Sequence, residues 1–117
     1  MNPEAVKAMY DRHLTEVGEI VVIRRYTGSG LNRPRFDAEA RARVEGYVPS
    51  ELTATIQQGD RRIVLFEQDL HKMQFPLPVT SQDKIIVRGR ELSIVSVDNS
   101  TRRLQGSLIA LEIQARG

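Results

Sequence analysis

The sequence predicts a mainly β protein: a small antiparallel β-barrel with an N-terminal amphipathic α-helix and a long exposed loop. Three observations predict it: helical periodicity at the N-terminus, about seven short strand-like runs after it, and turn signals between most of these runs. Such strands tend to curl into a closed sheet because an open sheet leaves exposed edges. With 117 residues the chain is expected to be a single domain, with residues 1–18 as the helix and 19–117 as the barrel.

The composition excludes several classes of protein. The chain has 40% hydrophobic and 27% charged residues, which is ordinary for a folded domain. It has no cysteine, so a disulfide framework, a thiolate metal site and a cysteine nucleophile are excluded. A formal net charge of +2 is too small to attract polyanions by itself. We expect no membrane partner and no secretory signal, because no apolar run approaches the roughly 20 residues that span a bilayer and Glu4 interrupts the N-terminus.

The first segment is expected to be a helix with both ends marked. Asn2 can cap it, Pro3 suits its first turn, and Gly18 follows the last periodic residue. Apolar residues recur at three- and four-residue steps and form one face, which consists of Val6, Met9, Tyr10, Leu14 and Val17. This face either packs on the chain's own core, which is the more common arrangement, or contacts a neighbouring subunit.

The next residues indicate a strand, a loop and a second strand. Residues 19–26 (EIVVIRRY) are rich in β-branched side chains, and the glycines after them end the run. The stretch TGSGLNRPRFD has no apolar periodicity and predicts an exposed loop of about ten residues, longer than the usual connection. Residues 38–48 alternate in twos, which favours a strand whose one side carries Ala38, Ala40, Ala42, Val44 and Gly46.

The middle of the chain is expected to hold two more strands. These are residues 52–57 (LTATIQ) and 62–70 (RIVLFEQDL), joined by a hairpin turn at 58–60. Pro76 and Pro78 cannot donate to a central ladder, so the FPLPV stretch predicts an edge or a crossing loop.

The last third of the chain predicts a strand meander. It reads as KIIV, a turn at Arg88–Gly89, ELSIVSVD, a turn at residues 98–100, and GSLIALEIQA. Strand order cannot be obtained from these patterns.

No catalytic constellation is visible. The Gly-rich loop lacks a GK[ST] ending, and Arg33 stands where a dinucleotide fingerprint needs its third glycine. The one metal-like arrangement is Glu67, Asp69 and His71, which alternate along a strand-like run without a second cluster to complete a coordination shell. A solvated strand end explains the same residues. The sequence therefore predicts no enzyme, no cofactor and no bound metal, and a metal-dependent hydrolase ranks last among its functions.

Four arginines are the candidates for contact with DNA. A loop and one strand face could present them together to phosphate oxygens, and they are Arg33, Arg35, Arg41 and Arg43. Such contacts would be independent of base sequence. The alternative is a solvated face balanced by Glu39 and Glu45. Aromatic residues make up only 5% of the chain, which argues against a surface built on base stacking.

The order of elements resembles a known family. The chain combines the strand EIVVIRRYTG, a long loop with Arg and Gly, the strand ARVEGYVPSEL, and the closing run DKIIVRGRELSIVSVDNSTRRLQGSLIALEIQARG. Together they resemble the head-tail joining proteins of long-tailed bacteriophages, also called head completion or stopper proteins. The resemblance covers residues 19–117 and is most marked in the hairpin Val87–Asp98. It carries over no catalytic residue.

The resemblance implies a structural protein of the virion neck, made in the cytoplasm of the host bacterium. Such proteins form a ring, here expected to hold six copies, beneath the portal and its adaptor, where the ring retains packaged DNA and docks the tail. The implied partners are other copies of the chain, portal or adaptor proteins, tail proteins and packaged DNA. By position, the loop 26–37 would project toward the channel, so that Arg33 and Arg35 face DNA. The amphipathic helix departs from the shorter starts of the family.

Two further functions stay open. One is a tail terminator, which is the nearest relative in role. The other is a stand-alone nucleic-acid-binding β-barrel, with Arg41, Arg43 and the loop as its phosphate track.

Overall fold

The structure is a computed structural model that describes residues 2–28, 30–31 and 33–117. It is mainly β, with 44% of its residues in strands, as the sequence predicts. The elements in chain order are α1 (Pro3–Val17), β1 (Glu19–Tyr26), β2 (Arg35–Gly46), a 3-10 helix (Pro49–Glu51), β3 (Arg61–Phe66), α2 (Glu67–Lys72), β4 (Lys84–Val87), β5 (Arg90–Asp98), β6 (Arg103–Leu104), β7 (Ser107–Leu108) and β8 (Ala110–Arg116).

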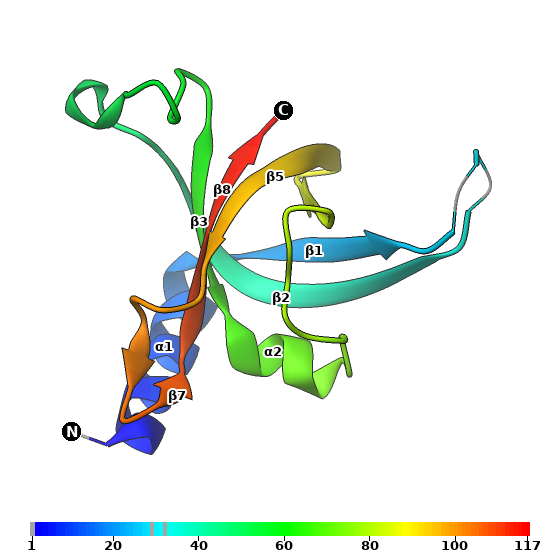
Figure 1. Ribbon diagram of the computed structural model, residues 1–117. Helices are drawn as coiled ribbons and strands as arrows, with labels where there is room; N and C mark the ends of the chain where they lie inside the picture. The colour runs from blue at the N-terminus through cyan, green and yellow to red at the C-terminus, as the bar shows by residue number, and fades with distance from the viewer. Residues whose placement is uncertain (1, 29, 32) are drawn as a thin grey trace.

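Six strands form a closed antiparallel barrel, which confirms the predicted fold class (Figure 1). The strand order is β1-β2-β3-β8-β5-β4, and β1 closes the barrel by pairing with β2 on one side and β4 on the other. Each of these strands pairs with a neighbour on both sides over at least part of its length, which closes the barrel. The short strands β6 and β7 form a separate hairpin.

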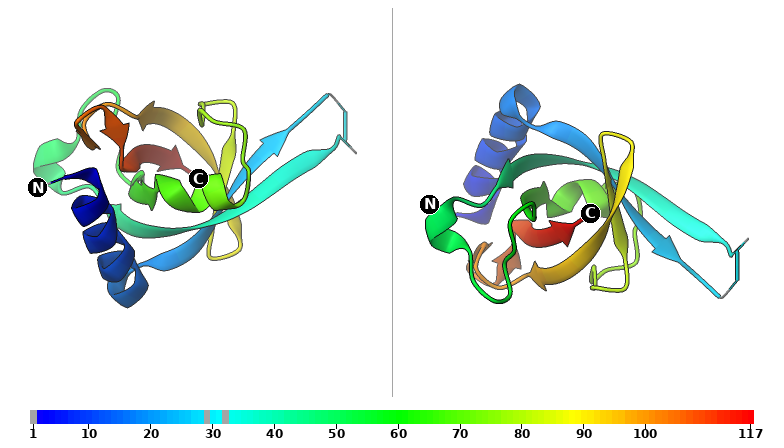
Figure 2. Two further views of the ribbon diagram at one scale, coloured as in Figure 1. Left: turned by 90° about the horizontal axis from the view of Figure 1, so that it is seen from below. Right: turned by 90° about the horizontal axis from the view of Figure 1, so that it is seen from above.

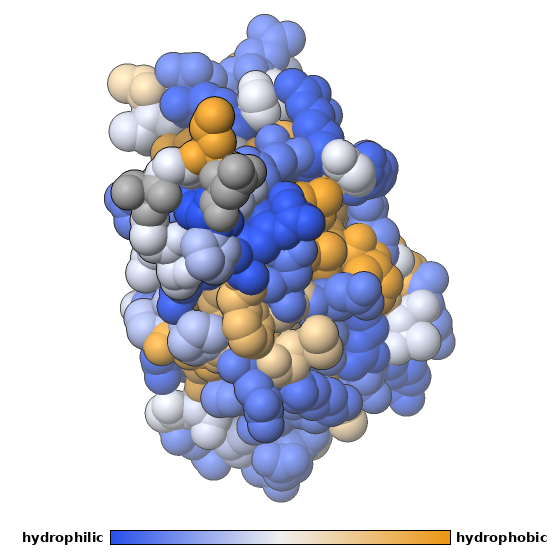
Figure 3. Space-filling model, turned by 90° about the vertical axis from the view of Figure 1, so that its right-hand side faces the viewer, coloured by the Kyte–Doolittle hydropathy of each residue, from blue (hydrophilic) through white to orange (hydrophobic). Residues whose placement is uncertain are grey.

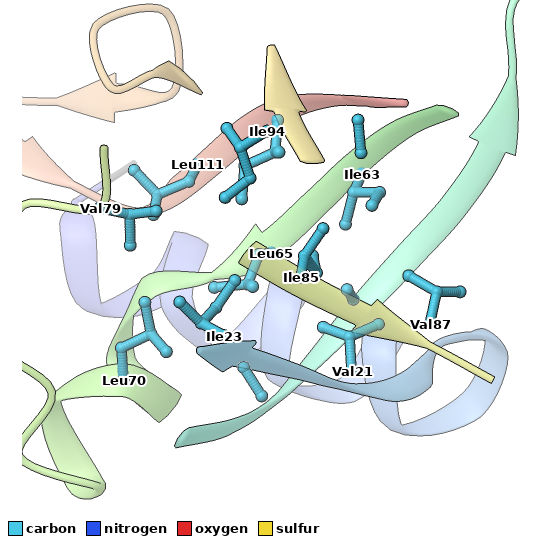
Figure 4. Close-up of a cluster of buried hydrophobic side chains, with 14 of the residues drawn as sticks. Val21, Ile23, Ile63, Leu65, Leu70, Val79, Ile85, Val87, Ile94 and Leu111 are labelled. Carbon is cyan, nitrogen blue, oxygen red and sulfur yellow. The ribbon is translucent and has the colours of Figure 1, made fainter. Parts of the chain in front are cut away.

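Aliphatic side chains from all six barrel strands fill the interior (Figure 4). The larger ones include Val21, Ile23, Ile63, Leu65 and Ile85. β2 contributes small side chains instead: Ala38, Ala40 and Ala42 are buried, as the alternation of this stretch predicts. Leu70 of α2 belongs to the same cluster, together with Phe75 and Val79 of the loop that follows it. α2 therefore covers one end of the barrel, the lower end in Figure 1.

The N-terminal helix forms where the sequence predicts it, and it packs on its own barrel. The Asn2 side chain accepts a hydrogen bond from the Ala5 amide at 2.8 Å, and the Gly18 amide donates to the Leu14 carbonyl at 3.0 Å. Leu14 is only 2% exposed, so the apolar face of α1 is anchored inside this chain. Figure 2 shows the helix lying against one side of the barrel.

The long loop is shorter than predicted because strand pairing extends into it. β2 begins at Arg35, and Arg35, Phe36 and Asp37 pair with the end of β1. The connection between the strands is therefore residues 27–34, and the predicted loop boundary at Asp37 is wrong. Cross-strand side-chain contacts, among them the hydrogen bonds from Arg24 to Asp37, stabilise this extension.

The strand predicted for residues 52–57 does not form. After the 3-10 helix the chain is irregular up to β3. The Thr53 hydroxyl accepts hydrogen bonds from the amides of Thr55 and Ile56, and the Asp60 carboxylate accepts one from the Gln57 amide. These local side-chain bonds to the backbone replace the ladder bonds that a strand would need.

The strand predicted for residues 62–70 ends early, at Phe66, where α2 begins. Leu70 follows Phe66 at helical spacing, and both are buried. The predicted crossing loop around Pro76 is confirmed as coil between α2 and β4. The predicted closing strand is also divided, into β7 and β8. β7 pairs with β6, and the Ile109 amide that follows donates to the Arg102 carbonyl instead of to a barrel strand.

The turn from α1 into β1 generates the first prediction. A Cβ on Gly18 would lie 2.5 Å from the Leu14 carbonyl oxygen and 2.9 Å from that of Ala42, whereas a Cβ on Gly46 meets nothing within 4 Å. Gly18→Ala is therefore expected to lower the free energy of unfolding by about 1–3 kcal/mol. The matched Gly46→Ala is expected to change it by less than about 0.5 kcal/mol. Urea unfolding followed by circular dichroism measures both, and equal effects would contradict the close approach.

Candidate functional site

The β1–β2 hairpin is the feature that extends furthest from the barrel (Figures 1 and 2). β1 pairs with β2 along its whole length but with β4 only over Val22–Arg24. Beyond Arg24 the hairpin is a two-stranded ribbon, which by itself is marginally stable in water. Near its end, the Thr27 amide donates a backbone hydrogen bond to the Pro34 carbonyl at 2.9 Å. The hairpin thus needs side-chain support, and both of its faces have some.

On the outer face, Arg24 connects both strands of the hairpin to β5. Its Nε and Nη2 donate to the two carboxylate oxygens of Asp37 at 2.8 and 3.0 Å, and its Nη1 donates to Glu91 at 3.2 Å. The Tyr26 hydroxyl donates to the same Glu91 oxygen at 2.7 Å. Glu91 lies on β5, so these bonds connect β1 to β5 across the short strand β4 that lies between them.

These contacts hold both carboxylates in their charged form. The hydrogen bond from Arg24 lowers the pKa of Asp37, and burial opposes it only in part. The Tyr26 hydroxyl lowers the pKa of Glu91, and Arg24 adds to the effect. A carboxylate whose pKa is lower in the folded chain contributes stability above its ordinary pKa and loses it as the pH falls through the lowered value. Asp37 and Glu91 are therefore both charged at neutral pH, and their full contribution to the stability of the hairpin is present there.

On the opposite face, Arg25 ties the hairpin to the loop between α2 and β4. Its Nε donates to the buried carboxylate of Asp83 at 2.7 Å, and its two terminal nitrogens donate to the carbonyls of Pro76 and Pro78 at 2.7 and 2.8 Å. Phe75 lies under the guanidinium, 4.8 Å from it. Adjacent strand residues face opposite ways, so Arg24 and Arg25 support the hairpin from its two sides.

The end of the hairpin carries two of the predicted arginines. Arg33 stacks over the ring of Tyr26 at 4.1 Å, and the Arg35 Nε lies 3.9 Å from Asp37. Both are exposed, as is Leu31 at the tip. Figure 3 views the molecule from this side, where most of the surface is hydrophilic and apolar side chains appear in separate groups. The structure thus brings Arg33 and Arg35 together on an exposed projection.

Arg41 and Arg43 do not join them. They lie about 20–26 Å further along β2, at about 3.3 Å per residue. Arg41 donates to Asp69 of α2 at 2.9 Å and to Thr15 of α1 at 2.8 Å. With these bonds, and a further ion pair to Asp11, it joins both helices to β2. Arg43 is exposed beside Glu45 at 3.4 Å and faces the groove next to α1.

The helix face predicted as a subunit interface is divided by the fold. Leu14 is buried, Val6 is partly buried, and Tyr10 stacks on Phe66 with 6.3 Å between ring centroids. Met9 and Val17 remain 47% and 58% exposed. Met9 lines a groove of about 310 Å³ between α1 and strands β2 and β3, which has the buried Val64 in its lining. Met9 and Val17 are thus the most exposed apolar side chains of this face.

The three residues considered for metal binding lie on α2 rather than on a strand. Glu67 contacts His71, one helical turn later, at 2.5 Å. Asp69 points away from them and forms an ion pair with Arg41. Burial raises the pKa of Asp69, but the bonds from Arg41 outweigh it and lower the value overall. Within residues 2–28, 30–31 and 33–117, no group of three or more His, Asp or Glu side chains is placed to hold a metal ion.

No model of a known protein family matches this chain. No curated protein matches it either. In the part of the chain that the structure describes, there is no helix with the length and apolar character needed to cross a membrane.

Sequence reasoning missed the residues that support the hairpin. Asp37, Asp83 and Glu91 were not singled out, because a carboxylate indicates an ion pair only when the partner strand is known. The one available signal was the adjacent pair Arg24–Arg25, which strand alternation places on opposite faces.

The support of the hairpin gives the second prediction. Arg24→Gln removes the bonds to Asp37 and Glu91, so the ribbon should open more often. Amide hydrogen exchange at Thr27 is expected to become about tenfold faster, a loss of about 1.4 kcal/mol of local stability. Arg12→Gln, which changes an exposed helix arginine, is the matched control and should leave Thr27 unchanged. Equal exchange in the two variants would show that Arg24 does not support the hairpin.

Proposed function

We propose that the chain is a structural protein of the neck of a long-tailed bacteriophage or prophage particle. In this proposal, copies of the chain form a ring of six below the portal and its adaptor, join the head to the tail, and retain packaged DNA. The observation that carries it is the β1–β2 hairpin, a supported projection with two exposed arginines on a closed barrel. No catalytic step or cofactor is part of the proposal.

The way the hairpin is held supports this role. A ring that retains DNA must resist force on whatever projects into its channel. Here the hairpin is fixed on both faces by charged hydrogen bonds to β5 and to the loop before β4. Such bonds are stronger than neutral ones. Arg33 and Arg35 at its end suit phosphate oxygens of any base sequence.

Fewer apolar residues of α1 are free to contact a neighbouring copy in a ring than the sequence predicts. Contact between unlike faces of neighbouring copies generates a closed ring when the rotation closes. The exposed Met9 and the groove beside it offer one such face, while Leu14 is committed to the chain's own core.

A stand-alone nucleic-acid-binding barrel is disfavoured by the aromatic residues. Proteins that bind single strands use exposed rings on which bases stack. In this chain each aromatic side chain already has a partner: Tyr10 stacks on Phe66, Phe36 packs on Phe75, Tyr26 lies under Arg33, and Tyr47 under Arg62. A tail terminator stays the closest competitor, because a ring of small barrels serves either role.

Electron microscopy of particles made when the gene is silenced in its phage or prophage tests the proposal. We expect emptied heads and separate, finished tails, because the joint is missing. Overlong unattached tails would identify a tail terminator instead. Heads that bear tails of normal length would contradict any role in the neck.

Complementation then tests the hairpin itself. Particles supplied with Arg33→Gln/Arg35→Gln are expected to assemble heads and tails but to lose DNA, so the yield of infectious particles should fall at least tenfold. The control, Arg12→Gln/Lys72→Gln, removes the same charge from exposed positions on the helices and should complement fully. Equal yields from the two variants would exclude DNA contact by these arginines.

A further inference from the structure

A second basic site lies at the end of the barrel opposite α2. Arg61 begins β3, Arg90 begins β5, and Arg88 lies in the turn between β4 and β5. The three surround a hollow of about 440 Å³ that is also lined by Gly59 and Gly117. The C-terminus marks this end of the barrel at the top of Figure 1. Arg61 and the two arginines at the β4–β5 turn thus converge on one concave surface.

The hollow is lined by more basic than acidic side chains. No aspartate or glutamate lines it. Arg88 pairs with Glu19 at 2.6 Å, and Arg61 donates to the Gly59 carbonyl at 3.2 Å, whereas in the described residues neither Arg61 nor Arg90 pairs with an aspartate or glutamate. Elsewhere the pattern is different, since most of the other arginines, such as Arg24 and Arg41, are paired with acidic side chains. An excess of positively charged side chains in a concave site attracts anions.

The turn at Arg88 fixes the backbone from which its side chain reaches the hollow. Arg88 has φ of 51° and Gly89 has φ of 80°, which are the angles of a two-residue hairpin turn with both central residues left-handed. Asparagine or glycine is favoured at the first position, and a bulkier side chain there is strained by about 1 kcal/mol. Gln105 and Gly106 have the same angles, 51° and 81°, so the turn places Arg88 without itself indicating a function.

The residues that line the hollow favour a phosphate group over a peptide as its ligand. Its apolar members, Val87 and Leu92, are only 7% exposed each, so a peptide would find little apolar surface to bind. A guanidinium group presents paired donors that match phosphate oxygens. We propose that Arg61, Arg88 and Arg90 form a binding site for phosphate groups, either free or in the backbone of a nucleic acid. This site is separate from the hairpin, and it does not depend on the neck assignment.

Titration of the ¹⁵N-labelled protein by NMR tests the site. Inorganic phosphate is compared with chloride at equal ionic strength, and a short DNA duplex is added in a second series. We expect saturable shifts of the Nε–H signals of Arg61 and Arg90 and of the Gly59 amide. Shifts by both ligands, with phosphate competing, indicate a site for nucleic-acid backbone, and shifts by phosphate alone indicate a small-anion site. Both results support the proposal.

Two variants separate binding from folding. Arg61→Gln/Arg90→Gln should abolish the shifts, and for the duplex it should reduce the salt slope, d log K/d log [salt], by about two. Arg88→Asn should weaken phosphate binding several-fold while raising the melting temperature, because asparagine relieves the turn. The control Arg12→Gln/Lys72→Gln should bind phosphate like the unaltered protein.

Four outcomes would overturn the site. They are no saturable shift with either ligand, shifts spread evenly over all exposed arginines, shifts that persist in Arg61→Gln/Arg90→Gln, and saturation by an acidic peptide but not by phosphate or duplex.

Discussion

The closing contact of the barrel is the pairing of β1 with both β2 and β4, and the other features depend on it. β1 pairs with β4 over only Val22–Arg24, while its pairing with β2 continues to Tyr26 and Arg35. The same two strands therefore close the barrel and form the projecting ribbon. A ribbon that shares its strands with a packed barrel has a fixed base, and Ala38 and Ala40 leave room for the larger core side chains opposite them.

Arginine side chains connect several elements around the aliphatic core of this small fold. Arg24 and Arg25 fix the hairpin, Arg41 joins both helices to β2, and Arg116 binds the buried carboxylate of Asp60 at 2.9 Å. Its hydrogen bond to Arg116 lowers the pKa of Asp60. Arginines engaged in this way have few free donors for a ligand, and the more exposed arginines lie at the hairpin end and around the hollow at the other end of the barrel.

Local patterns predicted most elements but not their partners. The caps at Asn2 and Gly18, the alternating alanines of β2 and the Arg88–Gly89 turn were readable because each depends on neighbours in sequence. The strand expected at residues 52–57 failed because Thr53 and Asp60 bond to nearby backbone, which composition does not reveal. The sequence predicts Arg41 as an exposed basic residue because it does not reveal the partner, Asp69. Asp69 lies on α2, but residues 62–70 alternate in a pattern that predicts a strand. Ion pairs across the barrel need strand order and register, and neither is encoded locally.

Photo-crosslinking inside assembled particles tests the proposed neck function most directly. A photoreactive amino acid replaces Leu31 at the hairpin tip or, as the matched position, Leu52 in the irregular segment before β3. If the hairpin lines a channel that holds packaged DNA, position 31 forms adducts with DNA and position 52 does not. Adducts at position 31 that contain protein alone, or equal DNA adducts at both positions, would contradict the account.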